Sequence, residues 1–202
     1  MKLYYSPGSC SQSPHIVLRE AGLAFEPVLT PTKTHKTPDG TDYYTINPLG
    51  YVPLLELDDG TLLREGPAIV QYIADQVPQK NLAPANGTMA RYRLQEWLTF
   101  IGTEIHKGFS PLFNPAVPAE TKEVFKAKVV SRLEWVDSQL EGREFLMGEH
   151  FTVADAYLFV TSGWTVPMKI DISGLKNLVA WRERIAARPA VQEALKAEGL
   201  AK

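Results

Sequence analysis

The chain has 202 residues, 45% of them apolar and 22% charged, with a formal net charge of −2. This length and ordinary globular composition allow one large domain or two small ones that bury a core without disulfides or metals. A single cysteine excludes an internal disulfide, and with only four scattered histidines a structural zinc site is not expected. The lack of a basic block argues against nucleic-acid binding. The sequence shows no secretory signal and no apolar run long enough to span a membrane, so we expect a soluble cytoplasmic protein that does not associate with membranes.

The first 79 residues alternate strand and helix signals. Strands are expected at residues 2–5, 25–29, 52–57 and 61–64, a loop at residues 30–41, a helical turn at residues 42–47, and helices from Pro14 to Gly22 and from Gly66 onward. Ser13 is the expected N-cap of the first helix, and residues 58–60 form a hairpin turn. The order βαβ followed by ββα requires a parallel pair with a crossover helix and an antiparallel hairpin. This predicts an α/β domain with a mixed sheet.

Residues 80–86 are expected to be a linker, and residues 87–202 an all-helical domain. One apolar stripe begins near Thr88 and continues through Leu94, Trp97, Leu98, Ile101 and Ile105; a second, over residues 119–140, contains Val124, Val129, Leu133 and Val136. Thr152 and Asp155 have the spacing of a capping box, which predicts a helix start with a structural role for both residues. Further helices are expected at residues 178–187 and 191–198.

Cys10 follows a strand and a Pro-Gly turn and precedes the first expected helix. A helix N-terminus offers free backbone N–H groups and the positive end of the helix dipole, which favour the thiolate of Cys10 or of a bound thiol. The alternative is a buried cysteine that acts as a small apolar residue. Ser13 stands where a CxxC motif has its second cysteine, so a dithiol cycle is not available, whereas exchange with an external thiol is.

Two further stretches suit a peptide ligand. A cis Val52–Pro53 bond would leave the backbone of Val52 free to pair with an extended peptide. Gly66, at a helix N-terminus, can hold a carboxylate through its backbone N–H, and Glu65 can hold an ammonium group beside it. Together they suit the zwitterionic end of a γ-glutamyl group. The alternatives are a proline that only begins a strand and a helix start that is only capped.

These stretches, in this order, resemble the glutathione transferase superfamily over essentially the whole chain, and within it the bacterial beta class. The residues that carry the likeness are residues 4–11, 47–53, 65–66, 96–98, 106–109 and 151–157. The resemblance implies an N-terminal thioredoxin-like domain, a C-terminal helical bundle and a homodimer. It also implies glutathione as a substrate, a hydrophobic electrophile as the second substrate, and no metal.

The resemblance also implies roles at individual positions. Cys10 and His106 contact the glutathione sulfur as catalytic residues, and the backbone of Val52 binds the cysteinyl part. The remaining glutathione-binding positions, some of which act from the partner subunit, are Tyr5, Ser11, His35, Pro53, Glu65, Gly66, Thr99, Thr103 and Lys107. The electrophile is expected between the domains, beside Phe109, Phe113 and Trp164, although aromatic residues on helices also form cores.

At some of these positions the residues themselves leave alternatives open. Thr99, Thr103 and His106 follow i, i+4, i+7 spacing, which places them on one polar face, and that face is otherwise an ordinary solvated one. The family often has lysine at the position of His35 and asparagine at that of Thr99, so contacts at both points are expected to be weaker or rearranged. Tyr5 and Ser11 are rivals of Cys10, because other classes activate the thiol with tyrosine or serine near this turn.

Three functions therefore remain open. The first is conjugation of glutathione to electrophiles, which detoxifies them. The second is a glutathione-dependent thiol–disulfide oxidoreductase that uses Cys10, and the third is a non-catalytic glutathione-binding or stress-regulatory module. Turnover of an aryl halide compared with that of a mixed disulfide separates the first two, and no turnover of either substrate favours the third.

Overall fold

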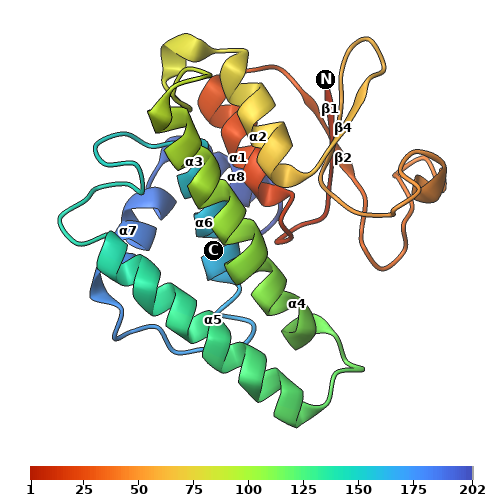
Figure 1. The fold of residues 1–202 in the computed structure, drawn as a ribbon. Coiled ribbons are helices and arrows are strands. Elements are labelled where there is room, and N and C mark those ends of the chain that lie inside the picture. The colour runs from red at the N-terminus through yellow and green to blue at the C-terminus, as the bar shows by residue number, and fades with distance from the viewer. Residues whose placement is uncertain (202) are drawn as a thin grey trace. The chain divides into compact units, whose positions relative to one another are not determined.

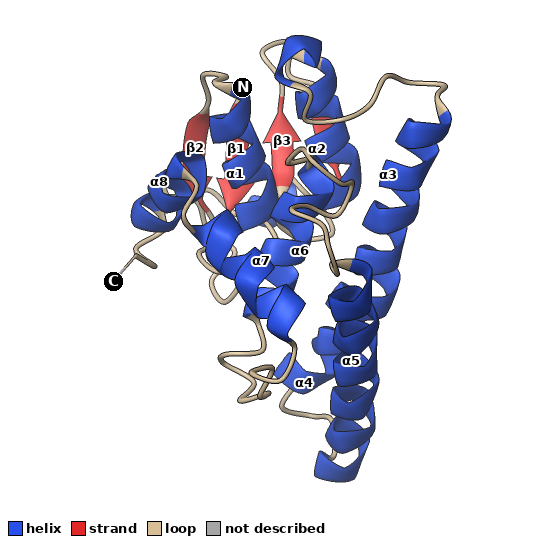
Figure 2. Cartoon of the chain, turned by 90° about the vertical axis from the view of Figure 1, so that its left-hand side faces the viewer, coloured by secondary structure: helices blue, strands red, loops and turns tan. Residues whose placement is uncertain are grey.

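The fold is given by a computed structural model that describes residues 1–201 and contains two compact units. The first unit joins Met1–Leu82 to the C-terminal segment that begins at Ala187, and the second is Ala83–Ala186. Figures 1 and 2 show the chain coloured by position and by secondary structure.

The first unit is an α/β domain, as the sequence predicts. Its strands and α-helices are β1 (Lys2–Tyr5), α1 (Gln12–Ala21), β2 (Glu26–Leu29), β3 (Leu54–Glu56), β4 (Leu62–Arg64), α2 (Gly66–Asp75) and α8 (Pro189–Ala197), with 3₁₀ turns at Tyr43–Thr45 and Pro78–Lys80. The strand order is β2-β1-β3-β4, with β1 parallel to β2 and antiparallel to β3. The predicted mixed sheet and hairpin are confirmed.

Alternation along the strands gives the sheet two buried faces. Leu3 and Leu55 form a cross-strand pair without exposed area, and Tyr4 pairs with Leu54 on the opposite face. Tyr4 and Leu54 pack with Tyr43 from the loop that follows β2. Helices α1 and α2 contact each other and lie against the sheet. The loop that carries the candidate site residues is thus anchored to the core.

Two sequence predictions about this unit are corrected. Helix α1 begins at Gln12 with Ser11 as the N-cap, two residues before the predicted start, so Cys10 lies closer to the helix than the sequence indicates. The predicted C-cap, Gly22, is confirmed by its left-handed backbone. The C-terminal helix α8, assigned by sequence to the helical domain, packs on α1 and belongs to the first unit. Arg188 at its start forms a two-bond ion pair with Glu20 of α1, a long-range contact that periodicity cannot reveal.

The second unit is entirely helical. It contains α3 (Met89–Phe100), a π-helical segment (Ile101–His106), α4 (Lys107–Phe113), α5 (Ala119–Gln139), α6 (Val153–Gly163) and α7 (Lys176–Ala186). The predicted stripe is buried at Leu94, Leu98, Ile101 and Ile105, and α5 buries Val129, Leu133 and Val136 against it. Val124, which the sequence placed on the α5 stripe, is 68% exposed because it lies on the opposite side of the helix from those three residues.

The predicted capping box at the start of α6 is confirmed. Asp155 has no exposed area, and its carboxylate accepts hydrogen bonds from the backbone N–H groups of Leu146 and Thr152, the Thr152 hydroxyl and the Trp181 indole. Burial raises the pKa of Asp155, and these donors oppose the rise by stabilising the charged form. Asp155 therefore joins α6, α7 and the preceding loop, which is the structural role that the sequence predicted for it.

Candidate functional site

Cys10 lies in the turn between β1 and α1 in the first unit. Its sulfur is 3.3 Å from the carbonyl oxygen of Val52, close enough for the thiol to donate a weak hydrogen bond. The side chain is partly exposed. The structure thus joins two of the predicted site residues, the thiol and the residue that precedes Pro53.

The backbone around Cys10 corrects one part of the sequence argument. The amides that were expected to be free at the start of α1 are already used: Ser11 N–H donates to the Ser9 hydroxyl, Gln12 N–H to the Ser9 carbonyl, and Ser13 N–H to the Cys10 carbonyl. These donors do not point toward a thiolate. The helix dipole remains as the electrostatic contribution of α1 at this position.

The two rival residues are buried beside this turn. The Ser11 hydroxyl has no exposed area and bonds to the backbone of Ser6 and to the Ser9 hydroxyl. Tyr5 packs edge-on against the ring of His15, and burial raises the pKa of its phenol. Both side chains are placed as structural supports of the turn.

The Val52–Pro53 bond is cis, as the sequence suggested. Val52 and Pro53 are buried, and the loop before them is fixed at the carbonyl of Tyr51, which accepts hydrogen bonds from the Tyr43 hydroxyl and the Asn47 amide. The Asn47 oxygen in turn accepts from Arg64. The Val52 backbone is therefore held at a defined position, with its carbonyl facing Cys10.

Glu65 and Gly66 begin α2. Glu65 is exposed and has φ of 67° and ψ of 112°, a left-handed backbone that a residue with a Cβ rarely adopts. Such backbone strain is found mostly at functional sites. Pro67 has no N–H, and the Gly66 N–H lies in the first helical turn, where no intrahelical acceptor exists.

His35 lies in the long loop after β2. Its ring is tilted against that of Tyr44, with ring centroids 4.7 Å apart, and its backbone is also left-handed, with φ of 49°. Its Nδ1 atom is buried and has no hydrogen-bond partner. A polar atom in that state is suited to a ligand contact.

Glu198 is a residue of this region that the sequence did not indicate. Its carboxylate is fully buried and accepts hydrogen bonds from the Gly8 N–H at 3.0 Å, the Gln12 amide at 3.1 Å and the His15 Nδ1 at 2.8 Å. Glu198 thus holds residues on both sides of Cys10 in the sequence, Gly8 before it and Gln12 after it. Because Glu198 lies 188 residues after Cys10 in the sequence, no local pattern could have identified it.

In the second unit, His106 ends the π-helical segment. Its Nδ1 is 2.6 Å from the hydroxyl oxygen of Tyr157 on α6. Burial, with a smaller effect from the charge of Lys107, lowers the pKa of His106 to about 4. The ring is therefore neutral near pH 7. The sequence indicated Tyr157 only as part of a helix motif, not as a partner of His106.

Phe109, Phe113 and Trp164, the three residues predicted for the electrophile site, lie together. Trp164 packs edge-on against both phenylalanines, with ring centroids 5.7 and 5.5 Å away, and against His106 at 4.9 Å. Phe109 is fully buried, whereas Phe113 is 47% exposed. The group therefore extends from the core, at Phe109, to a solvent-accessible end at Phe113.

The remaining predicted residues of the second unit, Thr99, Thr103 and Lys107, are exposed. The Thr103 hydroxyl donates to the carbonyl of Thr99. Each i→i+5 hydrogen bond of a π turn spans one more residue than the bond of an α turn, so α-helical spacing does not describe this face. His106 packs toward α6, while Thr99 and Thr103 face solvent.

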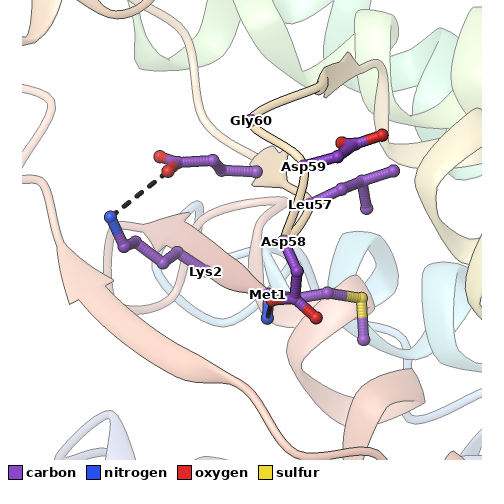
Figure 3. A pocket seen from close by; sticks show the side chains of 7 residues that line it. Met1, Lys2, Leu57, Asp58, Asp59 and Gly60 are labelled. Atoms are coloured by element: carbon purple, nitrogen blue, oxygen red, sulfur yellow. Dashed lines mark hydrogen bonds and ion pairs between the residues drawn. The ribbon is translucent and has the colours of Figure 1, made fainter.

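A surface pocket of the first unit lies away from these residues. It is formed by Met1, Lys2 and residues 56–60, with an ion pair between Lys2 and Glu56 at its edge (Figure 3). None of these seven residues is a predicted site residue. Within residues 1–201 there is no group of three or more side chains suited to hold a metal ion, and no helix of the length and apolarity that a membrane span needs.

Comparisons with known proteins show the family of the chain. The chain matches the glutathione S-transferase N-terminal domain over residues 7–76 and the glutathione S-transferase C-terminal domain over residues 100–189. It is 46% identical to the glutathione S-transferase GstA of Escherichia coli O157:H7, with 99% of this chain and 100% of the relative covered.

Solved structures extend the match. BphK, a bacterial glutathione S-transferase solved as a ternary complex, shares 57% identity with a TM-score of 0.97, covering 99% of this chain and all of that one. A sphingomonad glutathione S-transferase complexed with glutathione and a beta-class enzyme from Sphingomonas chungbukensis each share 50% identity, with a TM-score of 0.96 over the whole of both chains. The chain belongs to the glutathione S-transferase family, and its structural neighbours include the bacterial beta class.

Proposed function

We propose that this protein is a glutathione transferase that conjugates the thiol of reduced glutathione to electrophilic substrates. The observation that carries the proposal is the contact between the Cys10 sulfur and the Val52 carbonyl, where a thiol meets the loop edge suited to an extended peptide. The sphingomonad relative complexed with glutathione supports glutathione as the ligand.

In the first unit, glutathione lies along Val52 and Pro53, with its sulfur near Cys10. At the γ-glutamyl end, the Gly66 N–H donates a hydrogen bond to the carboxylate, and the Glu65 side chain binds the ammonium group. The Nδ1 atom of His35, which has no hydrogen-bond partner, forms a hydrogen bond with the glycine end of glutathione, as donor or as acceptor. Tyr5 and Ser11 act indirectly, by shaping the turn.

In the second unit, His106 is the catalytic partner of the sulfur, and Thr99, Thr103 and Lys107 contribute polar contacts. The accessible end of the aromatic group at Phe113 and Trp164 takes the apolar electrophile, and Phe109 supports it from the core. The electrophile is thus held by stacking rather than by charge.

The reaction is a substitution. Glutathione loses its thiol proton to solvent, the thiolate sulfur forms a bond to the electrophilic carbon, and the leaving group departs with the bonding electron pair, for example as halide. No redox step is needed. The protein's contribution is to orient the sulfur and to stabilise its negative charge before the attack.

The test compares conjugation of an aryl halide with reduction of a glutathione mixed disulfide, in the unmodified protein and in Cys10→Ala and Cys10→Ser. We expect turnover of the aryl halide by the unmodified protein, and loss of disulfide reduction in both variants. Serine retains a donor for the Val52 carbonyl but cannot form a disulfide, so it separates the two properties of Cys10. Unchanged activity of both kinds in Cys10→Ala contradicts the central role of Cys10.

A thiol–disulfide oxidoreductase is the second candidate, because the accessible Cys10 can form a mixed disulfide and Ser13 cannot resolve it internally. A faster turnover of the disulfide than of the aryl halide favours this candidate. Absence of both activities removes both enzymatic functions.

We also propose that the protein is a cytoplasmic homodimer. A single cysteine suits a reducing compartment, and the resemblance implies site residues from both subunits. Light scattering after size exclusion is expected to give twice the chain mass of 22.5 kDa.

A further inference from the structure

The hydrogen bond between His106 and Tyr157 has a consequence for catalysis. Tyr157 is only 3% exposed, and it lies on α6, where every residue from Val153 to Ser162 is buried. Its hydroxyl therefore has a fixed position, 2.6 Å from Nδ1 of His106. The Trp164 ring, whose centroid is 4.9 Å from that of His106, also limits rotation of the imidazole.

A neutral imidazole carries one N–H and one unprotonated nitrogen. If Tyr157 donates to Nδ1, the proton of the ring lies on Nε2. If Tyr157 instead accepts from an Nδ1–H, Nε2 has a lone pair. The direction of this one bond decides whether Nε2 is a hydrogen-bond donor or a base.

The distance favours donation by Tyr157. Hydrogen bonds with an O–H donor are typically 2.5–3.0 Å long, whereas N–H donors to oxygen are typically about 2.7–3.2 Å away. A phenol is also a strong donor, and an imidazole nitrogen accepts better than a phenol oxygen does. The observed 2.6 Å agrees with O–H to Nδ1.

His15 shows the opposite arrangement in the same chain. Its Nε2 is 3.1 Å from Nε of Arg19, which can only donate, so Nε2 must accept and Nδ1 carries the proton toward Glu198. Each of these two histidines is thus held in one tautomer by a single neighbouring group.

We propose that Tyr157 is a positioning residue that holds His106 in the Nε2–H tautomer, so that His106 acts on the glutathione sulfur as a neutral hydrogen-bond donor and not as a general base. The role assigned to Nε2 rests on the proposed function. In this arrangement the thiol proton leaves to solvent, and the Nε2–H stabilises the thiolate that remains. His106 changes neither its charge nor its protonation during turnover.

The first experiment measures the tautomer directly. The full-length protein is labelled with ¹⁵N-histidine, and long-range ¹H–¹⁵N correlation at pH 7 shows which ring nitrogen carries the proton; the missing signals in His106→Gln assign His106. We expect protonated Nε2 in the unmodified protein and a mixed population in Tyr157→Phe. Tyr92→Phe, which removes an exposed hydroxyl in the same unit, is expected to leave the signals unchanged.

A protonated Nδ1 in the unmodified protein, or unchanged His106 signals in Tyr157→Phe, overturns the proposal. The tautomer in the unmodified protein is determined without Tyr157→Phe, so the proposal stays testable even if that variant does not fold. The measurement also needs no glutathione. If the tautomer is as expected but no conjugation occurs, the proposed function fails and the Tyr157–His106 pairing stands.

The second experiment is kinetic. Tyr157→Phe is expected to lower kcat for aryl halide conjugation about tenfold, with KM for glutathione within about twofold, because the lost hydrogen bond affects the thiolate and not the binding of the peptide. His106→Gln, whose amide can donate, is expected to retain more activity than His106→Phe, which cannot. Equal loss in both His106 variants contradicts the donor role.

Discussion

At the scale of single residues, the surroundings of the Cys10 thiol are set by the Val52 loop more than by the amides of helix α1. The amides at the start of α1 are used within the turn, and the thiol instead faces the Val52 carbonyl. A bound peptide that uses the same carbonyl therefore meets Cys10 directly, although a carbonyl oxygen has two lone pairs and can serve both. The sequence predicted free backbone amides around Cys10, whereas the structure places the Val52 carbonyl beside the thiol.

Glu65 gives a prediction in which stability and binding change in opposite directions. Its left-handed backbone costs about 1–3 kcal/mol relative to an allowed conformation, and glycine has no Cβ to strain. Glu65→Gly is expected to raise the free energy of unfolding by about 1 kcal/mol while it weakens glutathione binding. Urea unfolding and calorimetric titration with glutathione measure the two effects.

Glu65→Gln is the matched control for that experiment. It keeps the side-chain size and the strained backbone but removes the charge. It is expected to weaken glutathione binding without the gain in stability. A loss of stability in Glu65→Gly would show that the backbone conformation is not strained.

His106 makes stability depend on pH. Its pKa is lowered from 6.5 to about 4 in the folded protein, so below pH 6.5 the unfolded chain binds a proton that the folded protein does not. Stability is therefore expected to fall by about 3 kcal/mol as the pH decreases from 6.5 to 4. The loss is complete below the folded pKa, where both states are protonated.

Urea unfolding across this pH range measures the effect. His106→Gln removes the titrating ring, so its stability is expected to vary less between pH 6.5 and 4. His150→Gln, on an exposed loop of the same unit, is the matched histidine substitution against which the effect of His106→Gln is compared. An identical slope in the unmodified protein and in His106→Gln contradicts the assignment.

At the scale of elements, the start of α6 depends on Asp155. Asp155→Asn replaces one accepting oxygen with an NH₂ group that faces buried donors, and is expected to cost about 3 kcal/mol of stability. Asp171→Asn, at an exposed loop with one hydrogen bond to the Ser173 backbone, is expected to change stability by no more than about 0.5 kcal/mol. Chemical unfolding followed by tryptophan fluorescence compares the two, and equal effects argue against the role of Asp155 as an organiser of the helical unit.

The π-helical segment is the element that sequence could not predict. The apolar spacing of residues 94–105 is satisfied by a continuous helix, and burial of Ile101 and Ile105 does not distinguish an α turn from a wider one. Glu104 in this segment pairs with Lys128 and Arg132 of α5, which holds the segment to its neighbour. The result is that His106 packs on α6, next to Tyr157, while Thr99 and Thr103 face solvent.

At the scale of the whole molecule, the chain returns to its first unit after completing the second. Helix α8 contributes Glu198, whose carboxylate holds the turn before Cys10 and the first residue of α1. Glu198→Gln is expected to cost about 2 kcal/mol of stability, because an amide cannot accept at both positions. It is also expected to lower disulfide reduction by Cys10, since the turn loses its support.

Glu193→Gln is the control for this prediction. Glu193 is on the same helix and pairs with Arg19, but its side chain is 64% exposed, so its loss is expected to cost less than about 1 kcal/mol. Thermal unfolding of the two variants is compared. Equal destabilisation contradicts the special role of Glu198.

The sequence by itself determined the family, the order of the strands and main helices, the mixed sheet and the capping box of α6, and it offered a cis Val52–Pro53 bond as one of two alternatives. These follow from local signals: alternation, turn residues, caps and a short motif each act over a few residues. Only the tertiary structure decided which partner each functional atom has. The contacts of Cys10 with the Val52 carbonyl, of the Gly8 N–H with Glu198 and of His106 with Tyr157 span 42, 190 and 51 residues. No spacing rule encodes such contacts, because they arise when separately predicted helices and loops pack together.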